Sequence, residues 1–388
     1  MAELKSFGVV GSGIMGRGIA EVAACRGGFQ KVVLQDIVQD QLDAAVKTIE
    51  KDLSKLVEKG KMDEAAKAKA LGCLQATTDA AALGECGFVV EAVPENLSIK
   101  EKVLGAVSAA VSKDAVVASN TSSIPITRLS GFVSRPESFI GMHFMNPVPR
   151  MKGLEIIKGL HTSREVCDLT LELGGRFGKE ITFSKDRAGF VINRVLIPML
   201  NDAVLGLDAG LGSVEAVDGF CKAEAGHPMG PFMLSDLIGL DTIEHILEVL
   251  AAELSESFAP AALLSKMVKA GACGQKTGKG FYVWERGRPP ALNAEVAALA
   301  AKKAADDGEK LGRRAWLVMI NEAVKVIEEG TSAVADVDRG CRFCLGHPRG
   351  ILAALDEMGA SGALEGLASA EKEFGAANPP VIELRRED

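Results

Sequence analysis

The sequence predicts an α/β domain with a doubly wound, mostly parallel sheet, followed by two tandem all-α domains. Three observations support this prediction. Short apolar runs alternate with helical segments through the first half of the chain, which is typical of parallel sheets with helices on both faces. From about residue 187 the apolar residues recur every three or four positions, as they do in helices. Part of this helical region also occurs twice in the chain.

The first domain, predicted for residues 1–186, begins with a strand, a glycine-rich turn, a helix and a second strand over residues 6–36. A charged helical stretch covers about residues 39–71, and a further helix covers residues 96–113. Three more apolar runs of strand length follow the charged stretch: residues 86–93, 114–120 and 138–144. Turn residues bound these short runs, so we expect them to be buried strands.

The helical region is predicted to contain two domains, residues 187–288 and 289–388. Residues 201–230 align without gaps on residues 321–350, and 12 of the 30 aligned pairs are identical. A charged, Gly- and Pro-containing stretch without periodicity, residues 285–295, is expected to link the two copies. The repeat indicates that the helical domain is duplicated.

The composition of the 388-residue chain limits the partners that we expect. The net charge is −8 and no basic stripe is visible, which argues against a nucleic-acid-binding groove. The eight cysteines are scattered and no signal peptide precedes the first strand, so we expect reduced thiols and a cytoplasmic protein. No apolar run is long enough to span a membrane. Cys341, Cys344 and His347 are too few ligands for a tetrahedral site, so no metal is predicted.

A G-x-G-x-x-G motif follows the first predicted strand and opens a predicted helix. This motif is common by chance, but its position between a strand and a helix indicates a dinucleotide-binding loop. Gly11 permits a tight turn, Gly13 lets the backbone approach a pyrophosphate, and Gly16 lets helix and strand pack closely. Free N–H groups at the helix start, with Ile14 and Met15 in its first turn, would face the anion. The first domain is therefore predicted to be Rossmann-like.

Asp36 ends the second predicted strand, twenty residues after Gly16. A carboxylate at this position accepts hydrogen bonds from the adenine-ribose hydroxyls and repels a 2′-phosphate, so NAD is predicted as the cofactor. The alternative is that Asp36 is only a polar residue at a strand end.

Two polar segments leave predicted strands at the edge of the sheet where the substrate should lie. "VVEAVPENLSIK" carries Glu95 and Lys100, and "VVASNTSSIP" carries Ser119, Asn120, Ser122 and Ser123. Taken alone, the second segment is more simply explained as a polar turn that caps a helix.

Seven motifs together resemble the L-3-hydroxyacyl-CoA dehydrogenases of β-oxidation and butyryl-CoA pathways. They occur in family order and spacing over residues 5–285, and they are "GSGIMGRGIA", "VVEAVPENLSIK", "ASNTSS", "GMHFMNPVPRMKGLEII", "GFVINRVL", "GHPMGPFMLSDLIGLD" and "GQKTGKGFY". The duplicated tail resembles the α-subunits of fatty-acid oxidation complexes, whose dehydrogenase part also ends in a second helical copy. The resemblance implies reversible NAD-dependent oxidation of L-3-hydroxyacyl-CoA to 3-oxoacyl-CoA.

The resemblance also implies roles for single residues. His143 would be the general acid/base for the 3-hydroxyl, and Glu155 would pair with its other ring nitrogen. Histidine suits this role because imidazole exchanges protons near neutral pH. Ser122 and Asn193 would hydrogen-bond the substrate oxygens. Ser122 also matches a cofactor-contacting position, together with Glu95, Lys100, Asn146 and Lys276.

The CoA contacts of the family are not reproduced residue for residue. Leu53 and Gly60 stand where the family has a basic residue and a serine, so Lys59 or Lys61 is the predicted substitute, unless these lysines are simply solvated. Two other readings remain open: a substrate without CoA, as in the gulonate dehydrogenase and λ-crystallin branch, or a non-catalytic binding protein. The catalytic residues and "NPVPRMKGLEII", taken together, argue against both alternatives.

The second helical copy is predicted to be structural. Arg313 stands at the position of Asn193, so the second copy should not form another active site. His227 and His347 lie in equivalent Gly-His-Pro turns, which favours a packing role for both. We expect the two copies to pack on each other as an internal pseudo-dimer, in a chain that is monomeric or weakly homo-oligomeric.

Overall fold

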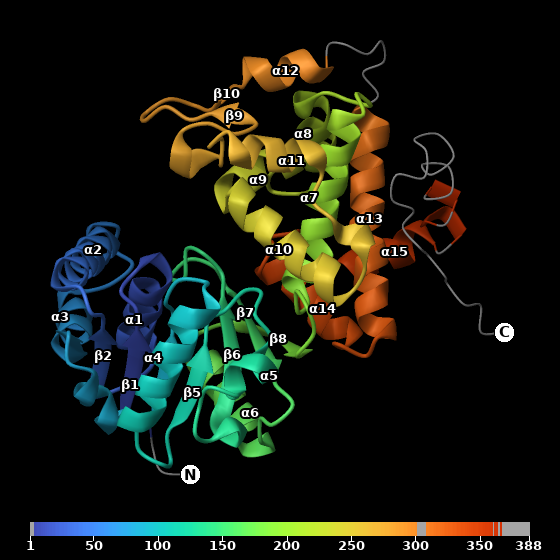
Figure 1. The fold of residues 1–388 in the computed structure, drawn as a ribbon. Helices are drawn as coiled ribbons and strands as arrows, with labels where there is room; N and C mark the ends of the chain where they lie inside the picture. Colours follow the sequence, from blue (N-terminus) through green and yellow to red (C-terminus); the bar gives the residue numbers. More distant parts are fainter. Residues whose placement is uncertain (1–3, 301–307, 360, 364, 367–388) are drawn as a thin grey trace. The chain divides into compact units, whose positions relative to one another are not determined.

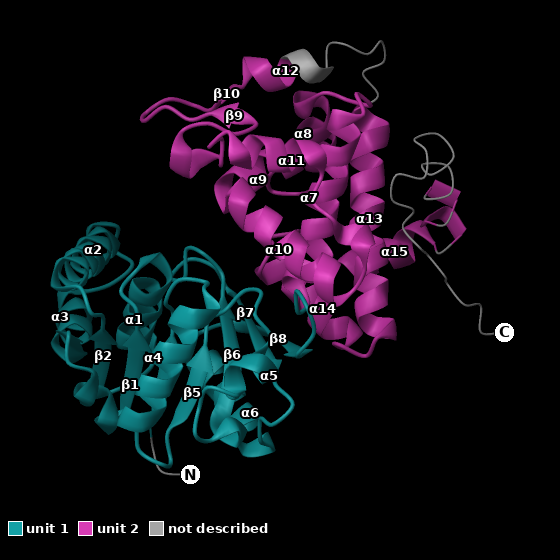
Figure 2. Ribbon diagram, viewed as in Figure 1, with its two compact units in different colours: residues 1–190 teal, residues 191–388 magenta. Residues whose placement is uncertain are grey.

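The computed structural model describes residues 4–300, 308–359, 361–363 and 365–366, and it divides the chain into two compact units. The first unit is residues 1–190 and the second is residues 191–388 (Figure 2). The boundary lies four residues after the predicted limit at residue 186. The two predicted helical domains fall within one unit.

The first unit contains a mostly parallel sheet of eight strands in the order β3-β2-β1-β4-β5-β6-β7-β8. Only β6 and β7 pair antiparallel among these neighbours. The strands are β1 (Ser6–Val10), β2 (Lys31–Gln35), β3 (Leu74–Thr77), β4 (Phe88–Glu91), β5 (Val116–Ser119), β6 (Phe139–Phe144), β7 (Gly153–Lys158) and β8 (Glu180–Lys185). The strand order reverses between β1 and β4, as in a doubly wound fold, so the predicted fold class is confirmed.

Helices cover both faces of this sheet (Figure 1). One core contains residues of α1, α2, α3 and α6, and the other contains residues of α4 and α5. Each central strand supplies alternate residues to the two cores; Val90 faces the first and Val89 the second. These helices are α1 (Ile14–Arg26), α2 (Gln39–Glu58), α3 (Glu64–Cys73), α4 (Leu97–Ala110), α5 (Ile126–Ser130) and α6 (Arg164–Arg176).

The helical stretch predicted for residues 39–71 is divided into two helices in the structure. Gly60, after α2, adopts a φ of 64°, a left-handed conformation that ends helices. Asp63 then caps α3, since its carboxylate accepts a hydrogen bond from the Ala66 N–H at 2.7 Å. Both the stop and the new start are local signals that the apolar periodicity alone does not show.

In the residues that the structure describes, the second unit is helical apart from a two-stranded sheet of β9 (Tyr282–Val283) and β10 (Ala291–Leu292). The stretch 285–295, predicted as a linker, contains β10, which pairs antiparallel with β9. The helices are α7 (Ile192–Asp208), α8 (Val214–Ala223), α9 (Pro231–Ile238), α10 (Leu240–Glu253), α11 (Ala262–Lys269), α12 (Ala294–Ala300), α13 (Gly308–Glu328), α14 (Val334–Phe343) and α15 (Ile351–Met358). The bounds of α14 and α15 are those of α8 and α9 shifted by 120 residues.

The two helical copies pack on each other through equivalent residues. Helices α7 and α13 lie along each other (Figure 1). The rings of His227 and His347, which occupy equivalent positions in the repeat, stack with centroids 4.2 Å apart. Such reciprocity, in which a residue meets its own counterpart, is the signature of a two-fold interface.

Two further findings bear on the predicted setting of the protein. In the part of the chain that the structure describes, no helix has the length and apolar character needed to cross a bilayer. All eight cysteines lie in that part and are free thiols.

The buried histidine stack should make stability depend on pH. Burial lowers the pKa of His227 from 6.5 to about 4, so the folded state binds fewer protons than the unfolded state between these values. The free energy of unfolding contributed by this site should therefore be intact above pH 6.5 and fall by about 3 kcal/mol as the pH falls to 4. Denaturation of His227→Phe, which keeps a stacking ring without the titration, should show a smaller loss over this range.

His245→Phe is the matched control, because the His245 side chain is half exposed. It should retain the pH dependence of the wild type. Equal pH dependence in His227→Phe and the wild type would contradict the assignment.

Candidate active site

The glycine turn between β1 and α1 has the shape of a dinucleotide-binding loop. Gly11 has a φ of 95°, and a Cβ there would lie 2.8 Å from the Ala92 carbonyl oxygen. A Cβ on Gly16 would collide with the Gly11 carbonyl oxygen. Gly13 precedes α1 with open space around its Cα, and no acidic residue lies in the first turn of the helix. The residues therefore fit a pyrophosphate held by the N–H groups of α1.

Asp36 lies at the end of β2, beside this turn, and its carboxylate is held in place. Oδ2 accepts hydrogen bonds from Ser12 N–H at 2.7 Å and from the Ser12 hydroxyl at 2.8 Å. Oδ1 accepts one from the Val38 N–H at 3.1 Å. Ser12 was not singled out from the sequence, because it occupies a variable position of the glycine motif. It is the residue that orients the carboxylate expected to bind the ribose.

A buried ion-pair network joins the ends of β4 and β5. Lys100 is 1% exposed, and its ammonium lies 2.8 Å from Glu91 Oε1 and 3.2 Å from Glu95 Oε2. Glu91, which is fully buried, also accepts a hydrogen bond from the Ser119 hydroxyl at 2.6 Å. Lys100, predicted to contact the cofactor, thus lies within this network and fixes Glu95. Glu91 was not predicted, since a carboxylate inside a strand gives no spacing signal.

Glu95 in turn organises the loop after β5. Its Oε1 accepts hydrogen bonds from the N–H groups of Ser122 at 2.9 Å and Ser123 at 3.0 Å, and from the Thr121 hydroxyl at 2.5 Å. Burial alone would raise the pKa of Glu95, but the Lys100 charge and these hydrogen bonds outweigh it and lower the pKa. The carboxylate is therefore a stable anion that fixes the position of Ser122.

His143 and Glu155 face each other across the antiparallel pair of β6 and β7. They are direct register partners, and His143 Nδ1 lies 2.9 Å from Glu155 Oε2. Glu155 is fully buried and His143 is 8% exposed. The Phe190 ring lies edge-on to the imidazole, with centroids 6.3 Å apart. The strand register thus brings together two residues that are twelve positions apart in the sequence.

Two side chains hold the segment after His143 in place by hydrogen bonds to its backbone. Asn120, at the end of β5, accepts a hydrogen bond from the Phe144 N–H at 2.9 Å. Lys179 is buried and donates to the carbonyl oxygens of Val148 at 2.6 Å and Met151 at 2.7 Å. Asn146 is exposed in this segment. Lys179 was not identified from the sequence, because its partners are backbone carbonyls.

The lysines predicted to contact CoA lie in the region between α2 and α3. Lys59 and Lys61 are exposed there, whereas Leu53 is fully buried in the core of the first unit. The two lysines are thus available to solvent, and the leucine has a packing role.

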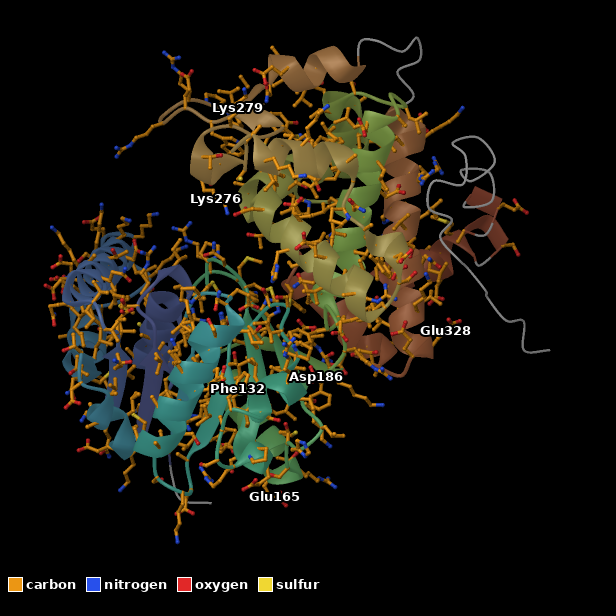
Figure 3. The ribbon with its side chains drawn as sticks, in the orientation of Figure 1. Phe132, Glu165, Asp186, Lys276, Lys279 and Glu328 are labelled. Atoms are coloured by element: carbon orange, nitrogen blue, oxygen red, sulfur yellow. The ribbon has the colours of Figure 1, made fainter. Side chains whose placement is uncertain are left out.

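Two predicted site residues belong to the second unit. Asn193 is buried in the first turn of α7. Lys276, labelled in Figure 3, forms an ion pair with Asp241, with Nζ 2.5 Å from Oδ1. Arg313, the counterpart of Asn193, is exposed and ion-paired with Glu309.

The comparison with family models decides the assignment. The model described as "3-hydroxyacyl-CoA dehydrogenase, NAD binding domain" matches residues 6–187. The model described as "3-hydroxyacyl-CoA dehydrogenase, C-terminal domain" matches twice, at residues 189–284 and 311–385. The chain belongs to the 3-hydroxyacyl-CoA dehydrogenase family. The predicted family, NAD cofactor and reaction, NAD-dependent 3-hydroxyacyl-CoA dehydrogenation, are confirmed.

Two curated relatives and one solved structure illustrate what this chain is similar to. A 3-hydroxybutyryl-CoA dehydrogenase of Bradyrhizobium diazoefficiens is 43% identical over 289 residues, which are 74% of this chain and 98% of the relative. A fatty acid oxidation complex subunit alpha of Idiomarina loihiensis is 36% identical over 357 residues, which are 89% of this chain and 49% of the relative. A crystal structure of 3-hydroxybutyryl-CoA dehydrogenase from Escherichia coli has a TM-score of 0.85 and 26% identity, and 97% of each chain is covered.

In this dehydrogenase, Ser12→Ala should weaken NAD binding without changing the chemical step. The substitution removes one hydrogen bond to Asp36 but leaves the backbone donor in place. A net hydrogen bond contributes about 0.5–1.5 kcal/mol, so the KM for NAD should rise roughly two- to tenfold while kcat is retained. Steady-state kinetics with varied NAD measures this.

The control is Ser54→Ala on α2, where the hydroxyl donates only to the Glu50 carbonyl oxygen one turn earlier. An unchanged KM in Ser12→Ala, or an equal rise in both variants, would show that Ser12 does not orient Asp36.

Proposed function

We propose that this chain oxidises the 3-hydroxyl of short-chain L-3-hydroxyacyl-CoA thioesters, with His143 as the general acid/base. The 2.9 Å contact between His143 Nδ1 and Glu155 Oε2 is the observation that carries this proposal. Both relatives named above as 3-hydroxybutyryl-CoA dehydrogenases have a four-carbon substrate in their names, which supports a short acyl chain.

The contact with Glu155 determines which nitrogen of His143 takes the substrate proton. A carboxylate only accepts hydrogen bonds, so the Glu155 contact places the imidazole hydrogen on Nδ1 and leaves Nε2 as the acceptor. Nε2 takes the proton from the 3-hydroxyl oxygen while the C3–H bond breaks and the C3–O double bond forms. NAD, when bound, would accept the hydride, which is the C3 hydrogen with both electrons of the broken bond. Glu155 stabilises the imidazolium that results.

Ser122 and Asn193 complete the proposed substrate site. The Glu95 network holds the backbone of Ser122, so its hydroxyl is a candidate donor to the substrate oxygen. Asn193 follows Phe190 by three positions, and the Phe190 ring is the one that packs against His143. Both side chains would bind the polar oxygens of the thioester, as the family resemblance implies.

The glycine turn and Asp36 would hold NAD. Ile14 is exposed at the start of α1 and Met15 follows it, so both are candidates for cofactor contact with Gly11, Gly13 and Gly16. Glu95, Lys100, Asn146 and Lys276 keep their proposed cofactor roles, although Lys100 would act through Glu95. Lys59 and Lys61 are exposed beyond α2 and would meet the CoA phosphates.

The packing of the two helical copies on each other supports the proposal that the chain is a monomer or a weak homo-oligomer. In this proposal, the reciprocal contacts between the copies take the place of the contacts that a single-copy subunit would make with a twin. We propose domain limits of 1–186, 187–288 and 289–388, and a cytoplasmic location, which the eight free thiols support.

Substitution of His143 tests the proposal directly. His143→Gln removes the base, and a positioned base contributes about 10²–10⁴-fold to the rate, so kcat should fall by this factor. Glu155→Gln keeps the shape but loses the charge, and a smaller fall in kcat is expected. The assay is acetoacetyl-CoA reduction by NADH.

His161→Gln is the control, because His161 is exposed and lies outside the site. Wild-type kcat in His143→Gln would refute the proposed mechanism.

A substrate without CoA is the second candidate, and it is favoured by one observation: Leu53 is buried at a position where the family has a CoA-contacting basic residue. The rates for acetoacetyl-CoA and free acetoacetate separate the two readings. Faster turnover of acetoacetyl-CoA is expected, and faster turnover of the free acid would show that the CoA part is not needed for substrate recognition.

A further inference from the structure

An arginine directly after Asn193 is anchored by the second helical copy. Arg194 lies in the first turn of α7 and is buried. Its guanidinium forms ion pairs with Glu322 of α13 and with Glu329, which lies 3.2 Å away just beyond that helix. The Phe258 ring packs against the guanidinium with its centroid 4.8 Å from Cζ.

This anchor has a counterpart elsewhere in the repeat. Arg314 is equivalent to Arg194, and Asp202 is equivalent to Glu322. Arg314 binds Asp202 with Nε 3.0 Å from both carboxylate oxygens. Each copy thus contributes one arginine and one acid to two reciprocal ion pairs.

The two ion pairs differ in ways that the duplication alone does not explain. On the Arg194 side, Glu329 adds a second carboxylate, and Lys325 lies 3.0 Å from Glu322. Their counterparts in the first copy are Ala209 and Leu205, which carry no charge. The additional charges therefore gather only on the side where the arginine follows Asn193.

Arg194 directly follows Asn193 in the first turn of α7. The ion pairs of Arg194 hold the turn that also carries Asn193.

We infer that Glu322 and Glu329 of the second copy are positioning residues for Asn193, acting through Arg194. This inference rests on the proposed role of Asn193 in binding the substrate oxygen. The second copy, which lacks an active-site asparagine of its own, would then contribute to catalysis by fixing the first turn of α7.

The test compares Glu322→Gln with its matched control Asp202→Asn, in the full chain. Both substitutions weaken a buried arginine ion pair, so a purely structural role predicts similar falls in Tm and similar kcat values. A positioning role predicts that kcat for acetoacetyl-CoA falls on the order of tenfold in Glu322→Gln. Asp202→Asn should stay close to the wild-type kcat at a similar Tm.

Glu329→Ala gives a second measurement that does not depend on a buried substitution, because the Glu329 side chain is 37% exposed. Its Tm should match the wild type while its kcat falls. Both effects on kcat should vanish in an Asn193→Ala background, since the two glutamates act through that residue.

Two results would overturn the inference while leaving the proposed function intact: equal kcat in Glu322→Gln and Asp202→Asn, or losses that persist undiminished in the Asn193→Ala background. A wild-type kcat in Asn193→Ala would instead remove the proposed role of Asn193, and the inference with it.

Discussion

The pairing of β6 with β7 is the constraint on which the site depends. A parallel neighbour would place His143 beside a different residue, but the antiparallel register sets it directly opposite Glu155. Both strands lie inside the sheet, so the carboxylate is shielded from water and its interaction with the imidazole is strengthened. The reversal of strand direction at this one place in a mostly parallel sheet is therefore what brings the proposed catalytic pair together.

Elsewhere in the first unit, polar groups are held at the ends of β4 and β5. Carboxyl ends of parallel strands meet at one edge of the sheet, which is where β4 and β5 deliver the Glu95 network. Burying Lys100 between two carboxylates has an electrostatic cost, and the network offsets it by making several hydrogen bonds to the loop that carries Ser122. In the proposed mechanism, the gain is a rigid position for Ser122.

Much of this architecture could be predicted from the sequence, and the exceptions have physical reasons. Strands β1, β2, β4, β5 and β6 are buried apolar runs, so each gave a clear signal. Strands β3 and β8 were missed because part of each is exposed, which weakens the apolar run. Strand β7 was missed because Glu155 interrupts its apolar residues. Ser12, Glu91 and Lys179 depend on tertiary partners, and no local pattern reveals them.

The most direct measurement is the tautomer of His143 in the neutral imidazole, by nitrogen-15 NMR with His143→Gln used to assign the signals. The structure predicts hydrogen on Nδ1 and a bare Nε2, because the Glu155 carboxylate accepts from Nδ1. Hydrogen on Nε2 instead would mean that the ring nitrogen proposed to take the substrate proton already carries one, and the mechanism would be contradicted.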